Sequence, residues 1–489
     1  MRSGKIRFLS SNSARHEAAN PKNCRIASRA VRTARASFLK IAFVIPSDSS
    51  TDFSGYRLRF ARMGVHLMLQ KYFLLFTVVL YGKAMKRYNP LFYYLALANF
   101  LFFLGNSFYI LLPVFLKNLG ASESYIGIMN NADKVFTIIT AVGIGSIMHG
   151  RDKIRILRLG YLILAAAYTS YLLISSLSWM ILAIRISHGI GFSVAMILGT
   201  SIIFDIVPME EAAVAIGLYG ATGALSNAVS PYIGEMLLSY GFSYYLIFAL
   251  SAILVLMSLA ITYRMPRPQR NVPDAGGASS SGSLHLFSNP RYLIMAMVTV
   301  IFGGGFGVIV TYLPNFIRTT TSFKFSIFFI IYIAVLILIR FTFIKTVNRI
   351  NRNILLVAVF CIGAIMNLCM NFLNTIIMLI IVSLMYGITH GILYPVLNTI
   401  LVGLVSPHDR GKANALFTAS FNSGMMVFAL ALGFCIDFFH SYLVAFNACF
   451  VAFGLAVALV LLFTYKYGML DYAIDASASI QETGSEQNL

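Results

Sequence analysis

The chain has 489 residues, of which 58% are hydrophobic and only 11% are charged, a composition that excludes an ordinary soluble protein. Several apolar runs approach or exceed the roughly 20 residues that a helix needs to cross a bilayer. The formal net charge of +20 belongs mostly to residues 1–90, which hold 17 Lys and Arg against three acidic residues. We therefore predict an all-α polytopic membrane protein with a basic N-terminal segment.

The basic segment, residues 1–88, carries no fold signature for nucleic-acid binding, so we expect no nucleic-acid partner. Its residues 1–62 are rich in Arg, Ser and Ala and poor in acidic residues. Three interpretations are open: a targeting peptide, a disordered basic tail near anionic lipid, or an extension outside the working protein. We favour the third, because Met85 makes a natural start just ahead of the first strong span.

Twelve transmembrane helices are predicted along the rest of the chain, six in each of two halves. In the N-terminal half, residues 89–264, the spans are 91–116, 124–148, 157–176, 179–204, 211–238 and 242–263. In the C-terminal half, residues 289–467, they are 291–316, 325–345, 353–372, 375–402, 413–436 and 441–465. Residues 265–288 form a flexible cytoplasmic linker, and residues 468–489 form a polar tail.

The basic residues outside the first segment predict the orientation of the bundle. With the N-terminus inside, 14 of them fall on inner loops and helix ends, and only Lys117, Arg318 and Lys324 fall on outer loops. Cytoplasmic loops carry an excess of Lys and Arg, so both termini are expected to be cytoplasmic. The alternation of inner loops rich in basic residues with outer loops poor in them also supports the number of spans. One missed span would reverse the assignment of every later loop.

The two halves repeat each other at a nearly constant offset. Asn89-Pro90 matches Asn289-Pro290, Leu112-Pro113 matches Leu313-Pro314, His188-Gly189 matches His390-Gly391, and Val207-Pro208 matches Ser406-Pro407. All offsets fall between 199 and 202. Two six-helix halves in the same orientation form the layout in which a central site alternates access by rocking.

Three motifs carry a resemblance to a known family. The fourth span has Ile181, Arg185, His188, Gly189 and Gly191; the fifth has Gly217, Ser226, Ser230, Pro231, Gly234 and Glu235; the inner loops have the basic cluster Arg151, Lys153, Arg349 and Arg352. From about residue 88 to 467 the chain resembles the major facilitator superfamily, and especially its bacterial drug/sugar efflux permeases. Serines replace two glycines of the fifth-span motif, which still allows close helix packing. Nothing in the sequence explains Glu235 at the end of that motif, or His149 and Asn348 where the loop motifs have an acid.

The resemblance implies the major facilitator fold and a bacterial plasma-membrane location. It also implies that the first, fourth, seventh and tenth helices line a central substrate cavity. The polar and aromatic residues expected there are Asn99, Asn106, His188, Tyr312, Tyr386, His390, Tyr394 and Asn398. The alternative is that these side chains only form hydrogen bonds between neighbouring helices.

Asp133 and Arg185 are charges inside predicted spans, where a charge is costly unless it faces protein or water. They lie roughly 14 Å and 10 Å from the outer face, near enough in depth to pair. In efflux members of the family the matching arginine is implicated in proton transfer, so our hypothesis is that Asp133 is the proton site and Arg185 its electrostatic partner. The alternatives are a fixed ion pair that never titrates, or two charges with different neighbours.

Three other charged residues lie in or near the spans. We expect Lys134 to point elsewhere, because adjacent residues do not share a helix face. We expect Asp205 and Asp437, near span ends, to be solvated or to cap helices.

The leading functional prediction is a secondary active transporter that exports a small organic molecule in exchange for protons. The alternative is a proton-coupled importer of the same fold. A membrane-embedded transferase with His188 or His390 as base is disfavoured, since an enzyme gains nothing obvious from a duplicated His-Gly pair. The sequence has no phosphate-binding loop, and its five cysteines have no metal-ligand spacing. We expect no enzyme activity, no cofactor and no metal, with a small-molecule substrate, protons and the lipid bilayer as partners of a monomer.

Overall fold

The computed structural model describes residues 88–148, 152–207, 209–266, 286, 288–342, 351–405 and 409–468. Most of the predicted N-terminal segment, nearly all of the linker and the C-terminal tail lie outside the described residues. Arg151 and Arg349 of the predicted inner-loop cluster lie outside them as well.

The described chain is helical, and its helices follow the predicted spans. The N-terminal half contains α4 (Pro90–Ser107), η2 (Phe108–Leu111), α5 (Leu112–Asn118), α6 (Glu123–Met148), α7 (Lys153–Ser170), η3 (Tyr171–Leu173), α8 (Met180–Ile206), α9 (Met209–Ser239) and α10 (Tyr244–Thr262). The C-terminal half contains α11 (Pro290–Thr320), α12 (Phe325–Thr342), α14 (Arg352–Cys369), η5 (Met370–Phe372), α15 (Ile376–Gly403), α16 (Arg410–Phe439) and α17 (Leu443–Tyr467). With α4 to α5 counted as one, the described residues contain twelve helical segments, one for each predicted span.

Nine of the described helical segments are long and apolar enough by themselves to cross a membrane. The remaining three are α6, α9 and α12. Each of these packs against the opposite half, α6 on α16 and α9 on α12. α12 is strongly apolar, and its apolar stretch Phe325–Ile339 is only shorter than those of the nine. We attribute the polar residues of α6 and α9 to their contact with the opposite half, because a helix that faces protein does not need an apolar surface all round.

The repeated Asn-Pro landmarks are helix starts. The side-chain oxygens of Asn89 and Asn289 each accept a hydrogen bond at 3.0 Å from the amide two residues on, and a proline follows each at the first helical position. Asparagine caps a helix well, and proline is tolerated there because its missing N–H would be unpaired anyway. Asp152 and Asn351 cap α7 and α14 in the same way. The repeat thus marks where helices begin.

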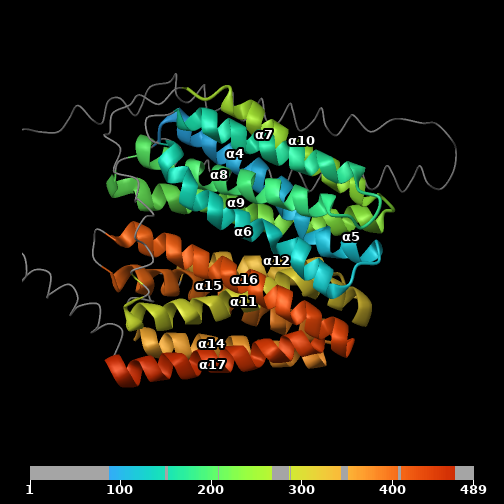
Figure 1. The fold of residues 1–489 in the computed structure, drawn as a ribbon, viewed down its shortest axis with the longest axis vertical. Coiled ribbons are helices and arrows are strands. Elements are labelled where there is room, and N and C mark those ends of the chain that lie inside the picture. Colours follow the sequence, from blue (N-terminus) through green and yellow to red (C-terminus); the bar gives the residue numbers. More distant parts are fainter. Residues whose placement is uncertain are drawn as a thin grey trace, which may run out of the picture.

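Helix packing follows the same repeat. In the N-terminal half α4 packs against α9 and α10, as α11 packs against α16 and α17 in the C-terminal half. Likewise α7 contacts α8 and α10 as α14 contacts α15 and α17, and α6 contacts α8 as α12 contacts α15. Figure 1 shows the two halves stacked, blue to green above yellow to red. The contacts between them, α6 with α16 and α12 with α9, are related by the same pseudo-symmetry.

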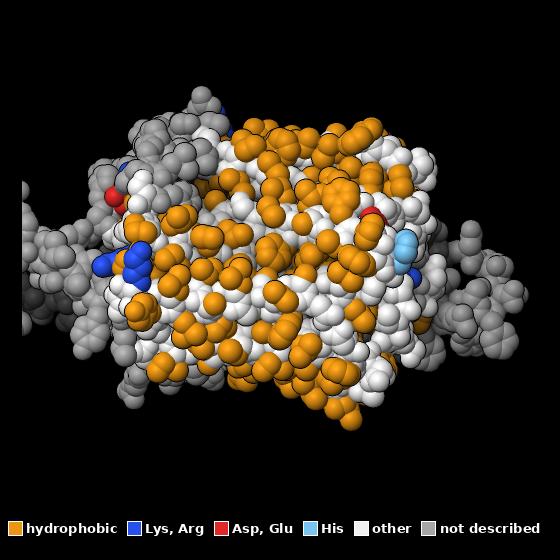
Figure 2. Space-filling model, turned by 60° about the horizontal axis from the view of Figure 1, so that its bottom comes forward, with side chains coloured by type: hydrophobic (Ala, Val, Ile, Leu, Met, Phe, Trp, Pro, Cys, Tyr) orange, Lys and Arg blue, Asp and Glu red, His pale blue; other side chains and the backbone are white. Residues whose placement is uncertain are grey.

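The outer surface of the bundle is suited to lipid. Figure 2 shows apolar side chains over most of one face, with Lys and Arg gathered at one end. Large apolar side chains such as Leu173, Phe434 and Val451 are more than half exposed. A soluble monomer rarely exposes apolar surface on this scale. The chain is therefore a multi-pass integral membrane protein.

The two halves are packed together at one end, which we call the outer end because it carries the predicted outer loop between α5 and α6. The main hydrophobic core fills the N-terminal half and continues into the outer parts of α11 and α12 through Phe316 and Phe325. The rest of the C-terminal half has its own core, around Phe417. In the inner parts of α6 and α9, a Cβ added at Gly143 or Gly217 would meet nothing within 4 Å.

Candidate functional site

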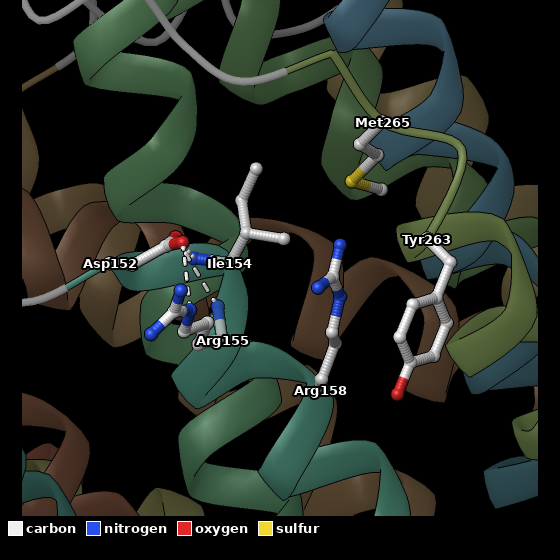
Figure 3. A pocket seen from close by; sticks show the side chains of 6 residues that line it. All are labelled: Asp152, Ile154, Arg155, Arg158, Tyr263 and Met265. Atoms are coloured by element: carbon white, nitrogen blue, oxygen red, sulfur yellow. Dashed lines mark hydrogen bonds and ion pairs between the residues drawn. The ribbon is translucent and has the colours of Figure 1, made fainter.

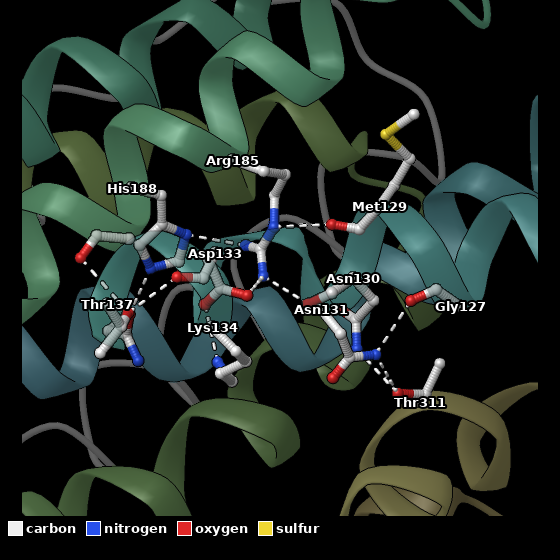
Figure 4. A network of polar contacts seen from close by, with 12 residues as sticks. Gly127, Met129, Asn130, Asn131, Asp133, Lys134, Thr137, Arg185, His188 and Thr311 are labelled. Carbon is white, nitrogen blue, oxygen red and sulfur yellow. Dashed lines mark hydrogen bonds and ion pairs between the residues drawn. The ribbon is translucent and has the colours of Figure 1, made fainter. Parts of the chain in front are cut away.

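Asp133 on α6 and Arg185 on α8 form a buried ion pair. A guanidinium nitrogen of Arg185 lies 2.6 Å from Asp133 Oδ1 (Figure 4). The Arg185 side chain is only 3% exposed and that of Asp133 only 2%. Charges this deep in a membrane bundle are tolerated when they pair with each other inside protein. Their predicted depths were thus compatible with the contact that the structure contains.

Protein groups hold Arg185 on every side of its guanidinium. Its Nε donates to the carbonyl of Met129 at 2.9 Å, and its Nη2 donates to the carbonyl of Asn130 at 2.5 Å. Its Nη1 lies 2.7 Å from His188 Nδ1. A planar guanidinium can satisfy several acceptors at fixed angles, which a lysine ammonium cannot do in the same way. Arg185 is therefore a fixed positive charge rather than a mobile one.

The prediction that Lys134 points away from Asp133 is wrong. Its Nζ lies 2.6 Å from Asp133 Oδ2, on the side of the carboxylate that Arg185 leaves free. Adjacent Cβ atoms do diverge on a helix, but the flexible four-carbon stem of lysine can bend back to its neighbour. The Lys134 side chain is 22% exposed, so it is the accessible partner. One carboxylate between two cations leaves this cluster with one net positive charge.

His188 extends the network towards the first and third spans. Because the Arg185 guanidinium can only donate, His188 Nδ1 must accept, which places the proton of the neutral ring on Nε2. Nε2 then donates to Asn106 Oδ1 at 2.9 Å, which also receives the Tyr168 hydroxyl at 2.9 Å. The structure thus joins two of the predicted cavity residues, Asn106 and His188, to the charge pair.

The two glycines of the fourth-span motif allow the helices to approach closely. A Cβ added at Gly189 would lie 2.2 Å from the backbone oxygen of Asp133 on α6. One added at Gly191 would lie 2.9 Å from the backbone oxygen of Gly160 on α7. Only glycine leaves room for both approaches, so the motif places Arg185 and brings α8 against its two neighbours at once.

His390, the repeat counterpart of His188, lies in an aromatic cluster. Its Nδ1 is 2.5 Å from the Tyr332 hydroxyl on α12, and its ring centroid is 4.7 Å from that of Phe306 on α11. Two further predicted cavity residues share the cluster: Tyr394 lies against His390, and Tyr386 packs on Tyr332. Both histidines therefore contact aromatic rings, and His188 in addition lies against the charge pair through Arg185.

The remaining predicted cavity residues have other neighbours. Asn99 donates to Tyr219 and Thr222 on α9, within its own half. The Tyr312 hydroxyl shares its proton between the backbone oxygen of Ala429 in its own half and that of Glu123 in the opposite half. Asn398 lies farther along α15 and is half-buried. For Asn99 and Tyr312 these contacts favour the packing alternative.

The fifth-span motif lies where α9 meets α4. The hydroxyls of Ser226 and Ser230 donate to the backbone oxygens of Phe100 and Leu104 on α4, at 2.9 and 2.7 Å. Serines in place of the family's glycines thus add hydrogen bonds to a close helix contact. A Cβ added at Gly234 would lie 2.4 Å from a Leu111 methyl group, whereas Gly217 borders open space; Pro231 lies inside α9.

The inner end carries the described part of the basic cluster and a pocket. Lys153 Nζ lies 2.8 Å from Asp205, and Arg352 is the first residue of α14. The pocket is lined by Asp152, Ile154, Arg155, Arg158, Tyr263 and Met265 (Figure 3). Arg158 donates to the Thr262 carbonyl at 2.8 Å and lies over the Tyr263 ring. The pocket sits between the inner ends of α7 and α10, whereas the Asp133 network lies deeper in the bundle.

Two repeated six-helix halves, an apolar outer surface and a buried charge network define a membrane transporter with an internal repeat. A model of the Major Facilitator Superfamily matches residues 95–366 and 318–473. The chain therefore belongs to the major facilitator superfamily. It is a transporter of small molecules, and it is not an enzyme.

Solved structures share this fold at low sequence identity. The nucleoside transporter NupG has 13% identity and a TM-score of 0.67, covering 78% of this chain and 100% of its own. A bacterial homolog of the human lysosomal transporter Spinster, in an inward-facing and unoccupied conformation, has 14% identity and a TM-score of 0.62, covering 77% and 96%. A D-xylose–proton symporter has 18% identity and a TM-score of 0.59, covering 76% and 96%. No curated protein sequence matches the chain significantly.

Proposed function

We propose that the protein exports a small organic molecule in exchange for protons by alternating access. Asp133 is the proton site and Arg185 its electrostatic partner. The observation that carries this proposal is the buried pair itself, because a membrane protein retains such charges at a cost and mainly where they function. We place the protein in a bacterial plasma membrane as a monomer. The distribution of its basic residues supports both termini lying in the cytoplasm.

The different environments of the two cations suggest how the site works. Arg185 is fixed by backbone carbonyls, while Lys134 reaches Asp133 from a partly exposed position. When Asp133 takes up a proton, the cluster gains a second net positive charge. Lys134 then loses its counter-charge and moves away, since two like charges repel in a poorly screened interior. Protonation of Asp133 in this way displaces the Lys134 side chain on α6.

α6 carries that displacement to the boundary between the halves. Asn130 and Asn131, just before Asp133, both donate to the Thr311 hydroxyl on α11, at 3.0 and 3.1 Å. The Asn130 carbonyl also accepts from Arg185, so a single residue contacts both the charge network and the opposite half. This contiguous set of hydrogen bonds supports coupling between protonation and rocking of the halves.

The solute is expected to bind between the two histidines. On one side His188 and Asn106 offer hydrogen-bonding groups beside the charge cluster. On the other side His390 and Tyr394 offer an aromatic wall. A molecule with a polar group and an apolar ring or chain fits both sides, because polar groups orient a ligand while apolar surface supplies most of its burial.

A transport assay tests this proposal. In inside-out vesicles with an acidic lumen, a panel of compounds is added outside, and solute-dependent dissipation of the pH gradient is recorded. We expect Asp133→Asn to abolish gradient-driven transport while solute binding stays measurable, and Asp133→Glu to recover part of it. Unchanged transport by Asp133→Asn would disprove the role of this carboxylate.

Proton-coupled import is the second candidate, because the structural relatives include a D-xylose–proton symporter. The same vesicles separate the two directions. For an exporter, solute added outside accumulates in the acidic lumen; for an importer, solute loaded into the lumen leaves together with protons.

A further inference from the structure

Two carboxylates at the outer end each bind the start of a helix in the opposite half. Asp437 on α16 accepts hydrogen bonds from the first two amides of α6: Oδ1 from Glu123 at 2.7 Å and Oδ2 from Ser124 at 2.8 Å. Glu235 on α9 does the same for α12: Oε1 accepts from Phe325 at 3.2 Å and Oε2 from Ser326 at 2.9 Å.

The two contacts are copies of each other under the internal repeat. Asp437 follows Glu235 by 202 residues, and Phe325-Ser326 follow Glu123-Ser124 by the same 202 residues. This offset lies within the range that relates the other landmarks of the two halves. Each carboxylate therefore occupies the equivalent place on its helix and binds the equivalent amides, although one side chain is Asp and the other is Glu.

We propose that Glu235 and Asp437 are paired gating residues that hold the outer entrance of the transporter closed. The inference concerns the gate and does not depend on the solute or on the role of Asp133. The first amides of a helix have no partner within it and form the positive end of its dipole, so a carboxylate there is bound by charge and by two hydrogen bonds. Because each carboxylate comes from the other half, the halves cannot separate at the outer end without breaking both contacts.

Further contacts reinforce the contact of Asp437. The Glu123 carboxylate accepts from the Tyr442 hydroxyl and forms an ion pair with Lys117 at 2.7 Å. The equivalent position at the other contact is Phe325, whose side chain is buried in the hydrophobic core. One contact is reinforced by polar groups and the other by apolar packing.

The distance between the outer ends of the two halves tests the proposal in the purified full-length protein. The five native cysteines are replaced by alanine, and spin labels are placed at Ser176 and Asn374, exposed residues on outer loops of different halves. Glu235→Gln and Asp437→Asn are each expected to increase the population with a long label-to-label distance about tenfold, as expected for the loss of one helix cap. The double variant should show about a hundredfold increase, because the two contacts use different helix pairs.

Asp152→Asn is the matched control. Asp152 also caps a helix start with its carboxylate, accepting from Ile154 at 3.0 Å, but it does so within one half and at the inner end. Its substitution should leave the outer distance unchanged. If a gate variant fails to fold, Asp437→Glu or Glu235→Asp, which keep the charge and change only the reach, takes its place.

Amide hydrogen exchange separates gating from a purely local cap. We expect Glu235→Gln to accelerate exchange at the start of α12, and Asp437→Asn at the start of α6. Faster exchange with an unchanged outer distance would overturn the proposal, since each carboxylate would then only cap a helix. Unchanged exchange and unchanged distance would overturn it as well.

Discussion

At the scale of single residues, the network around Asp133 separates a fixed cation from a mobile one. Arg185 is held by two backbone carbonyls and a histidine, whereas Lys134 forms an ion pair with Asp133 and is partly exposed to solvent. The sequence identified Arg185 as the partner of Asp133 but wrongly placed Lys134 elsewhere, so it missed the second cation. The distinction depends on carbonyls of α6 that approach α8 only in the folded bundle.

The charge pair leads to a stability prediction. Arg185→Met is expected to lower the free energy of unfolding by about 3 kcal/mol, near the lower end of the range for breaking a buried pair, since Lys134 still faces Asp133. Adding Asp133→Asn should recover part of this loss, because it removes a buried carboxylate whose remaining charged partner is the partly exposed Lys134. Unfolding in mixed micelles measures all three variants. Arg155→Met, at an exposed arginine, is the control and should change the value by less than about 0.5 kcal/mol; a double variant less stable than Arg185→Met would contradict this account.

At the scale of helices, the sequence predicted the starts of spans well and the contacts between halves poorly. Asn89 and Asn289 could be recognised because capping and proline placement act within a few residues. Glu235 could not be explained in this way, since its partners are amides of α12 in the opposite half. One sequence signal was available: Glu235 and Asp437 are carboxylates near outer span ends at the spacing of the repeat.

The fourth-span motif leads to a prediction about helix packing. Gly189→Ala is expected to destabilise the protein by about 1–3 kcal/mol, because the new Cβ would force α8 away from the backbone of α6 at Asp133. The same substitution at Gly217 is the control: it meets nothing within 4 Å and should stabilise α9 by up to about 1 kcal/mol. Mixed-micelle unfolding measures both. Equal effects at the two glycines would show that helix propensity, and not the approach of α8 to α6, decides the outcome.

At the scale of the whole molecule, the repeat supplies two equivalent contacts between the halves, and both close the outer end. α6 links this closure to the charge network: it begins at the Asp437 contact, contacts Thr311 through Asn130 about two turns later, and then reaches Asp133 and Arg185. A shift of α6 changes all three contacts, because closely packed helices have low compressibility and transmit displacement.

The close approach of α6 and α16 provides a test of this arrangement. A Cβ added at Gly433 would lie 2.5 Å from the Tyr312 hydroxyl and 2.8 Å from the Glu123 carbonyl, so Gly433→Val should push the halves apart at the outer end. We expect a cysteine placed at Thr311, fully buried between the halves, to react about tenfold faster with an impermeant maleimide from the outer side. Gly454→Val, on α17 with nothing within 4 Å, should leave the rate unchanged. Equal reaction rates in all backgrounds would mean that the outer ends separate without involving the α6–α16 contact. A displacement of α6 caused by protonation of Asp133 could not then open the outer gate.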